Sequence, residues 1–558
     1  MREQQLNPAQ LNNLTRGGYF SRLNTFFFNF KRIRLHNWLE ILNRFYGNYP
    51  IIELEQSFNY PFLSQGYLGY SDLLNWVYRA GRALLELGVK KGERVLIIPS
   101  NRLELALLNF ACHRIGAVAV PVNFMFSASE INYIIEDCQP RVLVTDQEVY
   151  SRTFQNNPQI PEVEHFLILE EDVPLGVKSL GRLMAEVEPE LEPVFLRLNE
   201  TAQILYTSGT TGYPKGALIS QMNLLYFIRA FSAIGSPFPR RERELLVTSL
   251  PLAHIMGFML LIIRLCSRTR WYFLNRFNPE QVLELIEKKR ATSFIGVPAM
   301  FSMLKQVGLE GRDLGSVILW GSAADKMPEH LLQYFQRFGY HRFIFPLFVE
   351  MYGQVETTGA ISFRVVFPWQ KPKTGFIGVL FPWVKFRVVK ENGELAQIGE
   401  IGELEIKGPM VSSGYWKREE ESREKGWHKT GDLVRKEKFR RLYFVGRKSE
   451  RIKYKGYSIF PAEVERELSE HPAIKEVAVL GIPEPQLGEV PVAVVTLQSG
   501  AKVSEPELLE WAKNHIALFK CPRQIKIISQ MPRGSTQKIL KRELKQLFLN
   551  TSSAKEEK

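Results

Sequence analysis

The fold is decided by the stretch from Arg94 to Asp146, which contains in order RVLIIPSN, ELALLNFACHRIG, AVAVPVN, SASEINYIIEDC and RVLVTD. Short apolar runs rich in β-branched residues alternate here with amphipathic stretches of helical length. Strands without polar alternation are buried on both faces, which is typical of a mainly parallel sheet covered by helices. Later runs at 292–298 (TSFIGVP) and 316–323 (SVILWGSA) continue the pattern. We therefore expect an α/β fold.

Beyond about Phe376 the sequence changes character. Residues 386–408 (FRVVKENGELAQIGEIGELEIKG) combine repeated Gly and Glu with alternating apolar residues, which predicts a small β subdomain of antiparallel strands. After Gly446 a compact α+β unit follows, with a helix beginning at Pro461, strands at 474–483 and 490–497, and a helix at 505–516. We predict a large N-terminal domain at 1–446, a smaller C-terminal domain at 447–550 and a disordered tail at 551–558.

Composition limits the class of protein. The 558 residues are enough for several domains, and 45% hydrophobic with 23% charged residues is ordinary for globular proteins. The formal charge of +13 favours anionic partners such as nucleotides, phosphorylated cofactors or acidic lipid surfaces. The basic residues are dispersed and accompany no zinc-finger or RNP-type signature, so nucleic acid is disfavoured as a partner.

Cysteine usage and the chain's start predict a cytoplasmic location. The four cysteines are scattered and form no CxxC pair, which argues against a disulfide framework or a zinc site. The start lacks a signal pattern, and the longest apolar stretch, Ile255–Cys266, is too short for a membrane span. Residues 18–49 mix aromatic and basic side chains, which predicts either a helix on a membrane surface or a helix packed on its own domain.

The segment Tyr206–Ala217 (YTSGTTGYPKGA) has the composition of a phosphate loop. It follows the strand-like AQIL and precedes a helix-like stretch from Asn223, and its Lys215 adds a positive charge. Glycines allow close backbone approach, and hydroxyls donate hydrogen bonds to phosphate oxygens. The alternative is a flexible Ser/Gly/Thr turn. The glycines are Gly209, Gly212 and Gly216, and the hydroxyls belong to Thr207, Ser208, Thr210 and Thr211.

The loop does not have the GxxxxGK[ST] form, because Lys215 follows Gly212 by three residues. It resembles instead the signature loop of the adenylate-forming superfamily, which includes acyl-CoA synthetases, beetle luciferases and peptide-synthetase adenylation domains. The resemblance covers nearly the whole chain, with further segments in the expected order. It implies ATP-dependent and Mg²⁺-dependent activation of a carboxylic acid to an acyl adenylate with release of pyrophosphate, followed by thioester formation with coenzyme A.

Two segments of the N-terminal domain resemble the family's acid and adenine sites. PLAHIMG at 251–257 implies His254 beside the activated carbonyl, although a lone His among apolar residues is also typical of a core. WGSAADKMPEHL implies that the small residues Gly321, Ser322 and Ala323 pack on the adenine, with an ordinary helix start as the alternative.

MYGQVETTG resembles the family's YGxTE segment. Tyr352 is implied to stack on the adenine, and Glu356 to hold Mg²⁺ on the phosphates through an oxygen ligand. Val355 stands where the family usually has Thr, so a hydroxyl or amide contact to the α-phosphate falls to Gln354 or Thr357. The resemblance also implies a nucleotide contact for Gly353 and a metal contact for Thr207.

HKTGDL resembles the family's TGD segment, in which Asp432 accepts hydrogen bonds from both ribose hydroxyls; an ordinary Gly-Asp turn is the alternative. VGRKSERIKYKGYSIFPAEVE resembles the linker and the start of a mobile C-terminal domain. Arg447 is implied at the ribose, Ser449 at the hinge where the family often has Asp or Lys, and Lys453 and Gly456 at the nucleotide and thiol side.

MPRGSTQKILKREL resembles the family's terminal PRTxxGK, and Lys538 is the implied catalytic lysine. Its ammonium is expected to neutralise charge between the carboxylate and the α-phosphate. Gln537 replaces the usual glycine. In the family the small domain rotates between the two steps and presents the 455–457 face to the thiol.

The acid is expected to be fatty or aryl rather than acetate, with Phe258, Met259, Phe294, Ile295 and Met300 as apolar pocket candidates that are equally compatible with a core. Amino-acid activation is disfavoured because LAHIMGF lacks an Asp for the α-amine.

Two rival functions stay open. One is a ligase that loads an acyl carrier protein, and the other is a degenerate, non-catalytic nucleotide or acyl binder, motivated by Val355 and Gln537.

Overall fold

The protein is seen here in a computed structural model that describes residues 33–55, 60–63, 66–155, 161–207, 213–234, 244–339, 346–370, 375–418, 426–454, 457–484, 488–534 and 539–552. The chain packs into two compact units. Unit 1 comprises Met1–Pro372 and Gly408–Glu424, and unit 2 comprises Lys373–Lys407 and Lys425–Lys558. The expected division into an N-terminal domain at 1–446 and a mobile C-terminal domain at 447–550 stays a prediction.

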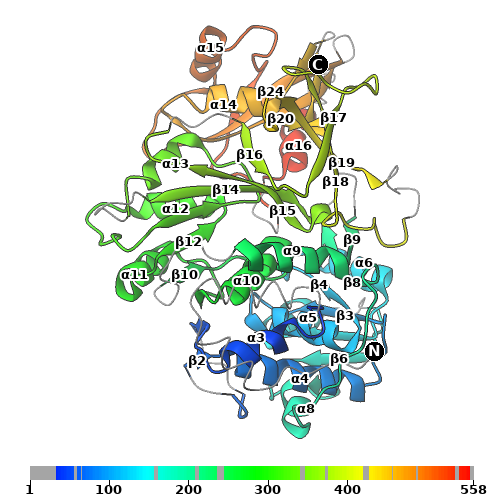
Figure 1. The fold of residues 1–558 in the computed structure, drawn as a ribbon. Coiled ribbons are helices and arrows are strands. Elements are labelled where there is room, and N and C mark those ends of the chain that lie inside the picture. Colours follow the sequence, from blue (N-terminus) through cyan, green and yellow to red (C-terminus); the bar gives the residue numbers. More distant parts are fainter. Residues whose placement is uncertain are drawn as a thin grey trace. The chain divides into compact units, whose positions relative to one another are not determined.

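The Arg94–Asp146 stretch forms the centre of one sheet of unit 1, with strand order β7-β6-β5-β3-β4-β8-β9 (Figure 1). Its pairs are parallel except for the last, β8 with β9. The α/β expectation is therefore confirmed. The strands are β3 (Arg94–Ile98), β4 (Val118–Pro121), β5 (Val142–Thr145), β6 (His165–Ile168), β7 (Lys178–Ser179), β8 (Thr201–Thr207) and β9 (Lys215–Ser220).

Helices cover both faces of this sheet. Along β3, Val95 and Ile97 belong to a large core cluster, whereas Leu96 and Ile98 belong to a second cluster on the opposite face. This is why the strand carries no polar alternation. The helices around the sheet are α3 (Trp38–Tyr46), α4 (Tyr70–Glu86), α5 (Leu103–Ile115), α6 (Ala128–Cys138), α7 (Gln147–Val149), α8 (Leu180–Glu186) and α9 (Gln221–Ile234), and a π-helical turn spans Tyr150–Phe154.

Helix α5 differs from its expected amphipathic character, because all of its residues are buried. Its polar residues find partners inside the protein. The Asn109 side chain donates to the Leu105 carbonyl and accepts from Gln203, and Arg114 donates to the Leu191 carbonyl. A helix enclosed on all sides needs such internal partners, because water cannot reach its polar groups.

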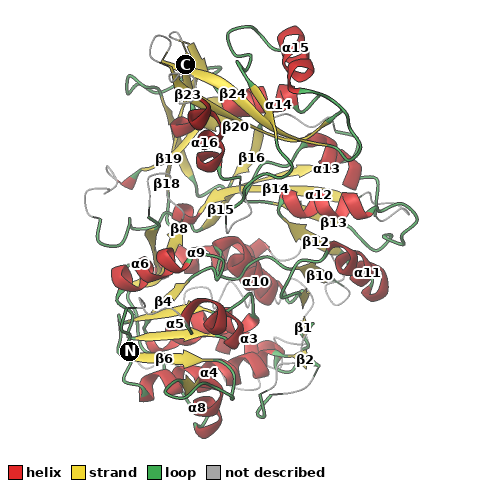
Figure 2. Ribbon diagram, turned by 180° about the vertical axis from the view of Figure 1, so that it is seen from behind, coloured by secondary structure: helices red, strands yellow, loops and turns green. Residues whose placement is uncertain are grey.

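A second sheet of unit 1 has the order β15-β14-β13-β12-β10-β11-β1-β2, parallel except at its two ends (Figure 2). The strands are β1 (Ile52–Leu54), β2 (Tyr67–Leu68), β10 (Leu245–Thr248), β11 (Arg270–Phe273), β12 (Ser293–Gly296), β13 (Leu319–Ser322), β14 (Leu347–Gln354) and β15 (Gly359–Val366). The helices that follow its strands are α10 (Ile255–Ser267), α11 (Pro279–Lys289), α12 (Pro298–Val307) and α13 (Glu329–Phe335).

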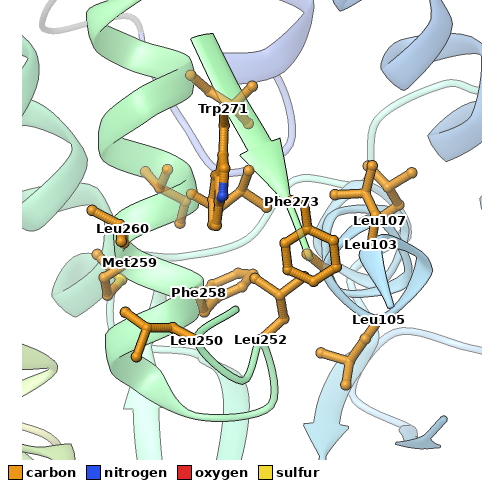
Figure 3. Packing of buried hydrophobic residues seen from close by; sticks show 14 of the residues in the cluster. Leu103, Leu105, Leu107, Leu250, Leu252, Phe258, Met259, Leu260, Trp271 and Phe273 are labelled. Atoms are coloured by element: carbon orange, nitrogen blue, oxygen red, sulfur yellow. The ribbon is translucent and has the colours of Figure 1, made fainter. Parts of the chain in front are cut away.

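The large core cluster joins elements of both sheets. Figure 3 shows Leu105 of α5, Phe258 of α10 and Phe273 of β11 converging on one packed centre. The ring centroids of Phe258 and Phe110 lie 5.6 Å apart. Unit 1 therefore has a continuous hydrophobic interior that holds both sheets in place.

The aromatic and basic segment at 18–49 falls partly outside the described residues, which begin at 33. Within the described part, Trp38, Leu39 and Leu42 of α3 are buried, and Arg44 pairs with Glu40 on the surface at 2.6 Å. This part of the segment packs on its own unit, as the second alternative expected. None of the described helices combines the length and the apolar character needed to cross a bilayer.

Unit 2 contains two sheets. The first is antiparallel, with order β17-β18-β19-β20-β16, and corresponds to the predicted β subdomain. The second has the order β22-β21-β24-β23, with β25 parallel to β24. The strands are β16 (Phe376–Leu380), β17 (Lys385–Val389), β18 (Ile401–Lys407), β19 (His428–Lys436), β20 (Arg441–Arg447), β21 (Ile452–Tyr454), β22 (Tyr457–Ile459), β23 (Ile474–Glu484), β24 (Gly488–Leu497) and β25 (Ile525–Ile527).

The α+β elements predicted after Gly446 are present. Helix α14 (Pro461–Leu468) begins at the expected proline, α15 (Glu505–His515) begins behind a Ser504 cap, and α16 (Lys541–Ser552) closes the unit. Helix α16 runs two residues into the segment expected to be a disordered tail. The rest of that segment lies outside the described residues.

The buried His113 of α5 predicts a pH dependence of the free energy of unfolding. His113 is 1% exposed, no described residue lies within hydrogen-bond distance of either ring nitrogen, and burial lowers the pKa of His113 to about 3. The folded state keeps the ring neutral, whereas the unfolded chain binds a proton below about pH 6.5. Stability from this site is thus present above that pH and is lost as the pH falls toward 3.

Lowering the pH from about 7.5 to about 5 should reduce the free energy of unfolding of both the native chain and His113→Leu. We expect the reduction to be about 2 kcal/mol smaller in His113→Leu, because the variant lacks the imidazole that takes up a proton on unfolding. Denaturant unfolding at the two pH values measures this. The exposed His515→Leu is the control and should keep the native pH dependence. An equal reduction in the free energy of unfolding of His113→Leu and of the native chain would contradict a neutral imidazole in the folded protein.

Candidate active site

The phosphate-loop segment is a hairpin of unit 1. Thr207 ends β8 and Lys215 begins β9, and the two residues face each other in the antiparallel register. The Thr207 hydroxyl donates to the Lys215 carbonyl at 3.5 Å. The loop residues between them, Ser208, Gly209, Thr210, Thr211 and Gly212, lie outside the described residues. The hydroxyl-bearing Thr207 and the charged Lys215, which flank the predicted loop, are thus held side by side.

The element after the loop differs from the expectation. The helix expected from Asn223 is present as α9, which starts at Gln221, but the apolar run after Lys215 forms the strand β9 up to Ser220. The loop therefore joins two antiparallel strands rather than a strand and a helix. The run KGALIS pairs along most of β8, and this pairing outweighs any local helical preference.

Two tyrosines fasten the hairpin to α6. The Tyr206 hydroxyl donates to the Asp137 carboxylate, and burial raises the pKa of Tyr206 well above its usual range. Beyond the loop, the Tyr213 ring stacks on Tyr133 with centroids 4.5 Å apart and planes at 17°. Both ends of the loop are consequently anchored on one helix.

Glu356 lies in a short 3₁₀ turn, Val355–Thr357, directly after β14. The preceding Gly353 is required by close packing, since a Cβ there would lie 2.0 Å from the Gly359 carbonyl oxygen across the β14–β15 pair. This close approach fixes where β14 ends. Tyr352, Gly353 and Gln354 therefore lead directly to Glu356 at the carboxyl end of β14, which is parallel to β13. That edge of a parallel sheet is where ligands usually bind.

Tyr415 joins Glu356 to the phosphate-loop hairpin and was not identified from the sequence. Its hydroxyl donates to Glu356 Oε1 at 2.8 Å, and the Lys215 ammonium lies 5.5 Å from the centre of its ring. The tyrosine thus orients the carboxylate by a charge-assisted hydrogen bond and faces the lysine with its π surface. Tyr415 lies some sixty positions after Glu356 in the sequence, so spacing gives no signal of the contact.

The segment around Tyr415 binds both elements through its backbone. Trp416 N–H donates to the Gly216 carbonyl of β9, and Ser412 N–H donates to the Glu356 carbonyl, each at 2.8 Å. The Thr358 hydroxyl donates to the Met410 carbonyl at 2.7 Å. We call residues 409–417 the brace segment. It holds the lysine strand and the carboxylate turn at a fixed separation.

Of the two residues proposed to replace the missing threonine hydroxyl, Thr357 is already engaged. It is fully buried, and its hydroxyl donates to the carbonyl of Gln354 at 3.0 Å or of Gly359 at 2.9 Å. It also accepts from Gln354 N–H at 2.9 Å. Val355 is partly buried. The contact of Gln354 with the α-phosphate stays a prediction.

The small residues predicted to face adenine follow one another at the end of β13. Gly321 and Ser322 are in β13, and Ala323 comes next. A Cβ at Gly321 would lie 2.9 Å from the Ile295 side chain. The Ser322 hydroxyl is buried, with no hydrogen-bond partner among the described residues. Close packing on β12 therefore explains the glycine without a ligand, and the adenine contact stays a prediction.

His254 caps helix α10. Its Nδ1 accepts from Met256 N–H at 3.3 Å, so the proton of the neutral ring is on Nε2. His254 is partly exposed rather than enclosed in the core, and the helix start fixes its orientation. The Nε2–H therefore lies on the side of the imidazole away from the helix start.

The apolar pocket candidates Phe258, Met259, Phe294, Ile295 and Met300 are all members of the core cluster. Phe258 and Phe294 pack on other rings of the interior. Met259 also packs against Gly359, since its Cγ would lie 3.7 Å from a Cβ built on that glycine. The core alternative thus holds for most of this set.

The predicted ribose site of unit 2 is built as a pair across two strands. Asp432 of β19 and Arg447 of β20 face each other in register. Arg447 Nε lies 2.9 Å from Asp432 Oδ1, and the Asp432 side chain is completely buried. The Thr430 hydroxyl accepts from Asp432 N–H at 3.1 Å. The carboxylate is therefore fixed by its partner before any ligand binds.

The structure describes only some of the other predicted site residues of unit 2. Lys453 is exposed on β21, and Ser449 is exposed in a 3₁₀ turn, Lys448–Glu450. Lys448 pairs with Glu403 at 2.7 Å, beside the expected hinge. Gly456 and Lys538 lie outside the described residues, so their roles stay predictions.

Comparison with known proteins gives the family. The AMP-binding enzyme family matches residues 55–416, and the AMP-binding enzyme C-terminal domain matches residues 463–538.

Among curated relatives, the chain is 30% identical to an indoleacetate–CoA ligase of Aromatoleum aromaticum, over 86% of this chain and 93% of that protein. Among solved structures, ATP-bound MatB from Rhodopseudomonas palustris has a TM-score of 0.79 and 26% identity, covering 92% of this chain and 99% of that one. An o-succinylbenzoate CoA synthetase (MenE) from Bacillus subtilis, in complex with the acyl-adenylate intermediate OSB-AMP, has a TM-score of 0.75 and 27% identity, covering 91% and 98%. The family match, the relatives and the solved structures agree: the chain belongs to the AMP-binding enzyme family, within the adenylate-forming superfamily.

Proposed function

We propose that this enzyme activates a carboxylic acid with ATP and Mg²⁺ to an acyl adenylate, releases pyrophosphate, and transfers the acyl group to coenzyme A. The observation that carries the proposal is the assembly in unit 1 of Lys215, Glu356 and Tyr415, held together by the brace segment. This assembly brings together a cation of β9, next to the predicted phosphate loop of the first sheet, and a carboxylate at the end of β14 of the second sheet, with the Tyr415 hydroxyl on the carboxylate.

The metal expected by this proposal fits the residues present. Among the described residues, no group of three or more His, Cys, Asp or Glu side chains gathers as a metal cage. Mg²⁺ in nucleotide enzymes is usually held by one or two carboxylates together with the phosphates. Glu356 matches that arrangement, since Tyr415 occupies Oε1 and leaves Oε2 for the ion. When bound, Mg²⁺ neutralises phosphate charge.

The chain's own residues then deal with charge and position. Attack of a carboxylate on the α-phosphate joins two anions, and it needs cations near the developing charge. Lys215 and Lys538 would supply them, the second from unit 2. Asp432 would accept from the ribose hydroxyls while Arg447 holds its carboxylate in place. Gln354 would donate to the α-phosphate where the family usually has a threonine.

For the acid, we propose an aryl or arylalkanoic acid ahead of a fatty acid. The side chains nearest to a Cβ built on Gly359 are those of Met259, Phe227 and Ile255, at 3.7 to 3.9 Å. These side chains are buried members of the core cluster, so the interior next to the Glu356 turn is apolar, which suits an acid without a second charge. Two of the proteins compared above are named for indoleacetate and o-succinylbenzoate.

The first experiment measures pyrophosphate release with ATP, Mg²⁺ and a panel of indole, benzoyl, cinnamoyl and fatty acids, with and without coenzyme A. We expect release that depends on an aryl acid, with an acyl thioester formed only when coenzyme A is added. Lys538→Ala should lower the rate by about 10²-fold or more, because it removes a cation from the transition state.

The exposed Lys502→Ala is the matched control for Lys538→Ala and should behave as the native chain. ATP binding without release for any acid would point to a non-catalytic binder. Acyl-adenylate formation whose acyl group passes to a phosphopantetheinyl carrier protein but not to coenzyme A would identify the carrier-loading ligase instead.

Tyr415→Phe tests the assembly around Glu356. Removing the hydroxyl deletes a hydrogen bond to a charged group, so we expect the Mg²⁺ concentration for half-maximal activity to rise about tenfold. The kcat at saturating Mg²⁺ should be largely recovered, which a simple folding defect would not allow. Titration of Mg²⁺ in the pyrophosphate assay measures both values.

Tyr443→Phe, a tyrosine whose hydroxyl has no hydrogen-bond partner among the described residues, serves as control. An unchanged Mg²⁺ requirement for Tyr415→Phe would remove the positioning role from Tyr415 while leaving the ligase proposal intact.

A further inference from the structure

The turn that joins β19 to β20 in unit 2 has two central residues of types that rarely adopt its backbone conformation. Arg441 N–H donates to the Lys438 carbonyl at 3.3 Å, and Glu437 N–H donates to the Arg441 carbonyl at 2.9 Å. The two central residues are Phe439 with φ 57° and Arg440 with φ 59°. Two consecutive positive φ values are typical of a type I′ turn, which strongly prefers Asn-Gly. A phenylalanine here costs conformational free energy, so a folding role does not explain it.

The turn exposes this aromatic side chain instead of burying it. Phe439 is 86% exposed, and Val379 of the neighbouring strand β16 is 54% exposed. Val379 faces Arg441 in the β16–β20 register. Large apolar side chains at such exposure lose the free energy that burial would give. The tip thus holds an unburied aromatic ring in a strained backbone conformation.

The residues that flank Phe439 in the sequence are mostly basic. Residues 435–441 read RKEKFRR, five cations against one carboxylate. Glu437 lies 3.4 Å from Arg435, so that charge is already balanced. Arg440 donates to the Val384 carbonyl at 2.7 Å. Lys438 and Arg441 are exposed, and their side chains make no hydrogen bond or ion pair within the described parts of the chain.

We propose that the β19–β20 turn is a docking element for the anionic headgroup surface of a lipid bilayer. Phe439 inserts at the interface, and Lys438, Arg440 and Arg441 lie against acidic headgroups. An aromatic ring among basic residues is the combination that binds anionic membrane surfaces, where the ring is buried and the cations stay at headgroup level. The site is independent of the proposed ligase chemistry.

A bilayer fits this tip better than a folded protein partner. A stable protein interface buries about 800 Å² on each side, and one side chain at a convex turn offers far less. A bilayer accepts a single inserted ring and many separate charges. Single-stranded nucleic acid can also stack on an exposed aromatic ring among cations, so it is included as a competing ligand.

The test uses the full chain in co-sedimentation with vesicles of phosphatidylcholine, with and without phosphatidylglycerol. We expect binding that requires phosphatidylglycerol and weakens with salt. Phe439→Asn should weaken it about tenfold, and Lys438→Gln and Arg441→Gln about fivefold each. Asn tolerates positive φ, so the thermal midpoint of Phe439→Asn should be unchanged or higher.

Leu175→Asn is the matched control, because Leu175 is fully exposed at a turn of unit 1 with no cluster of cations. It should bind vesicles as the native chain does. The proposal is overturned if the native chain ignores phosphatidylglycerol, if Phe439→Asn binds like the native chain, or if a single-stranded oligonucleotide binds through Phe439 while vesicles do not. Loss of binding with an unchanged or raised midpoint in Phe439→Asn, and native binding in Leu175→Asn, supports it.

Discussion

The brace segment at 409–417 is the constraint on which the site of unit 1 depends. Its backbone bonds to β9 on one side and to the Glu356 turn on the other, and Tyr415 adds a side-chain bond to the same carboxylate. A lysine and a carboxylate that are more than a hundred residues apart in the sequence are thereby held in one geometry. Preorganisation of this kind means that little rearrangement is needed when charge develops during a reaction.

The architecture was largely predictable because it follows from burial. Strands β3 and β5 carry uninterrupted apolar runs, Val95–Ile98 and Val142–Val144, and only a sheet covered on both faces can enclose them. Helix starts with a strong local signal, such as Pro461 of α14 and Ser504 before α15, also lie where the sequence places them. Local signals and the tertiary structure agree at these positions.

The parts that could not be predicted depend on contacts between distant segments. β9 is a strand because β8 provides its hydrogen-bond partners, which the local sequence does not reveal. Thr357 was a candidate phosphate contact, yet its hydroxyl donates to the backbone carbonyl of Gln354 or Gly359. Tyr415 has no sequence feature that links it to Glu356. The residues placed by resemblance alone, including Lys538, keep the status of predictions.

The pair of Asp432 and Arg447 has a consequence for the predicted hinge. A buried carboxylate that loses its partner destabilises a protein by about 3–5 kcal/mol, so the predicted rotation at Ser449 should leave Arg447 beside Asp432, which lies in the same unit. Ser449 follows only two residues later, in an exposed 3₁₀ turn. Lys448 is half-exposed, and its ion pair with Glu403 is therefore weak and can break at small cost. A pivot after Arg447 would thus keep the carboxylate that is predicted to bind ribose fixed while the chain beyond it turns, which is compatible with both predicted roles of this strand end.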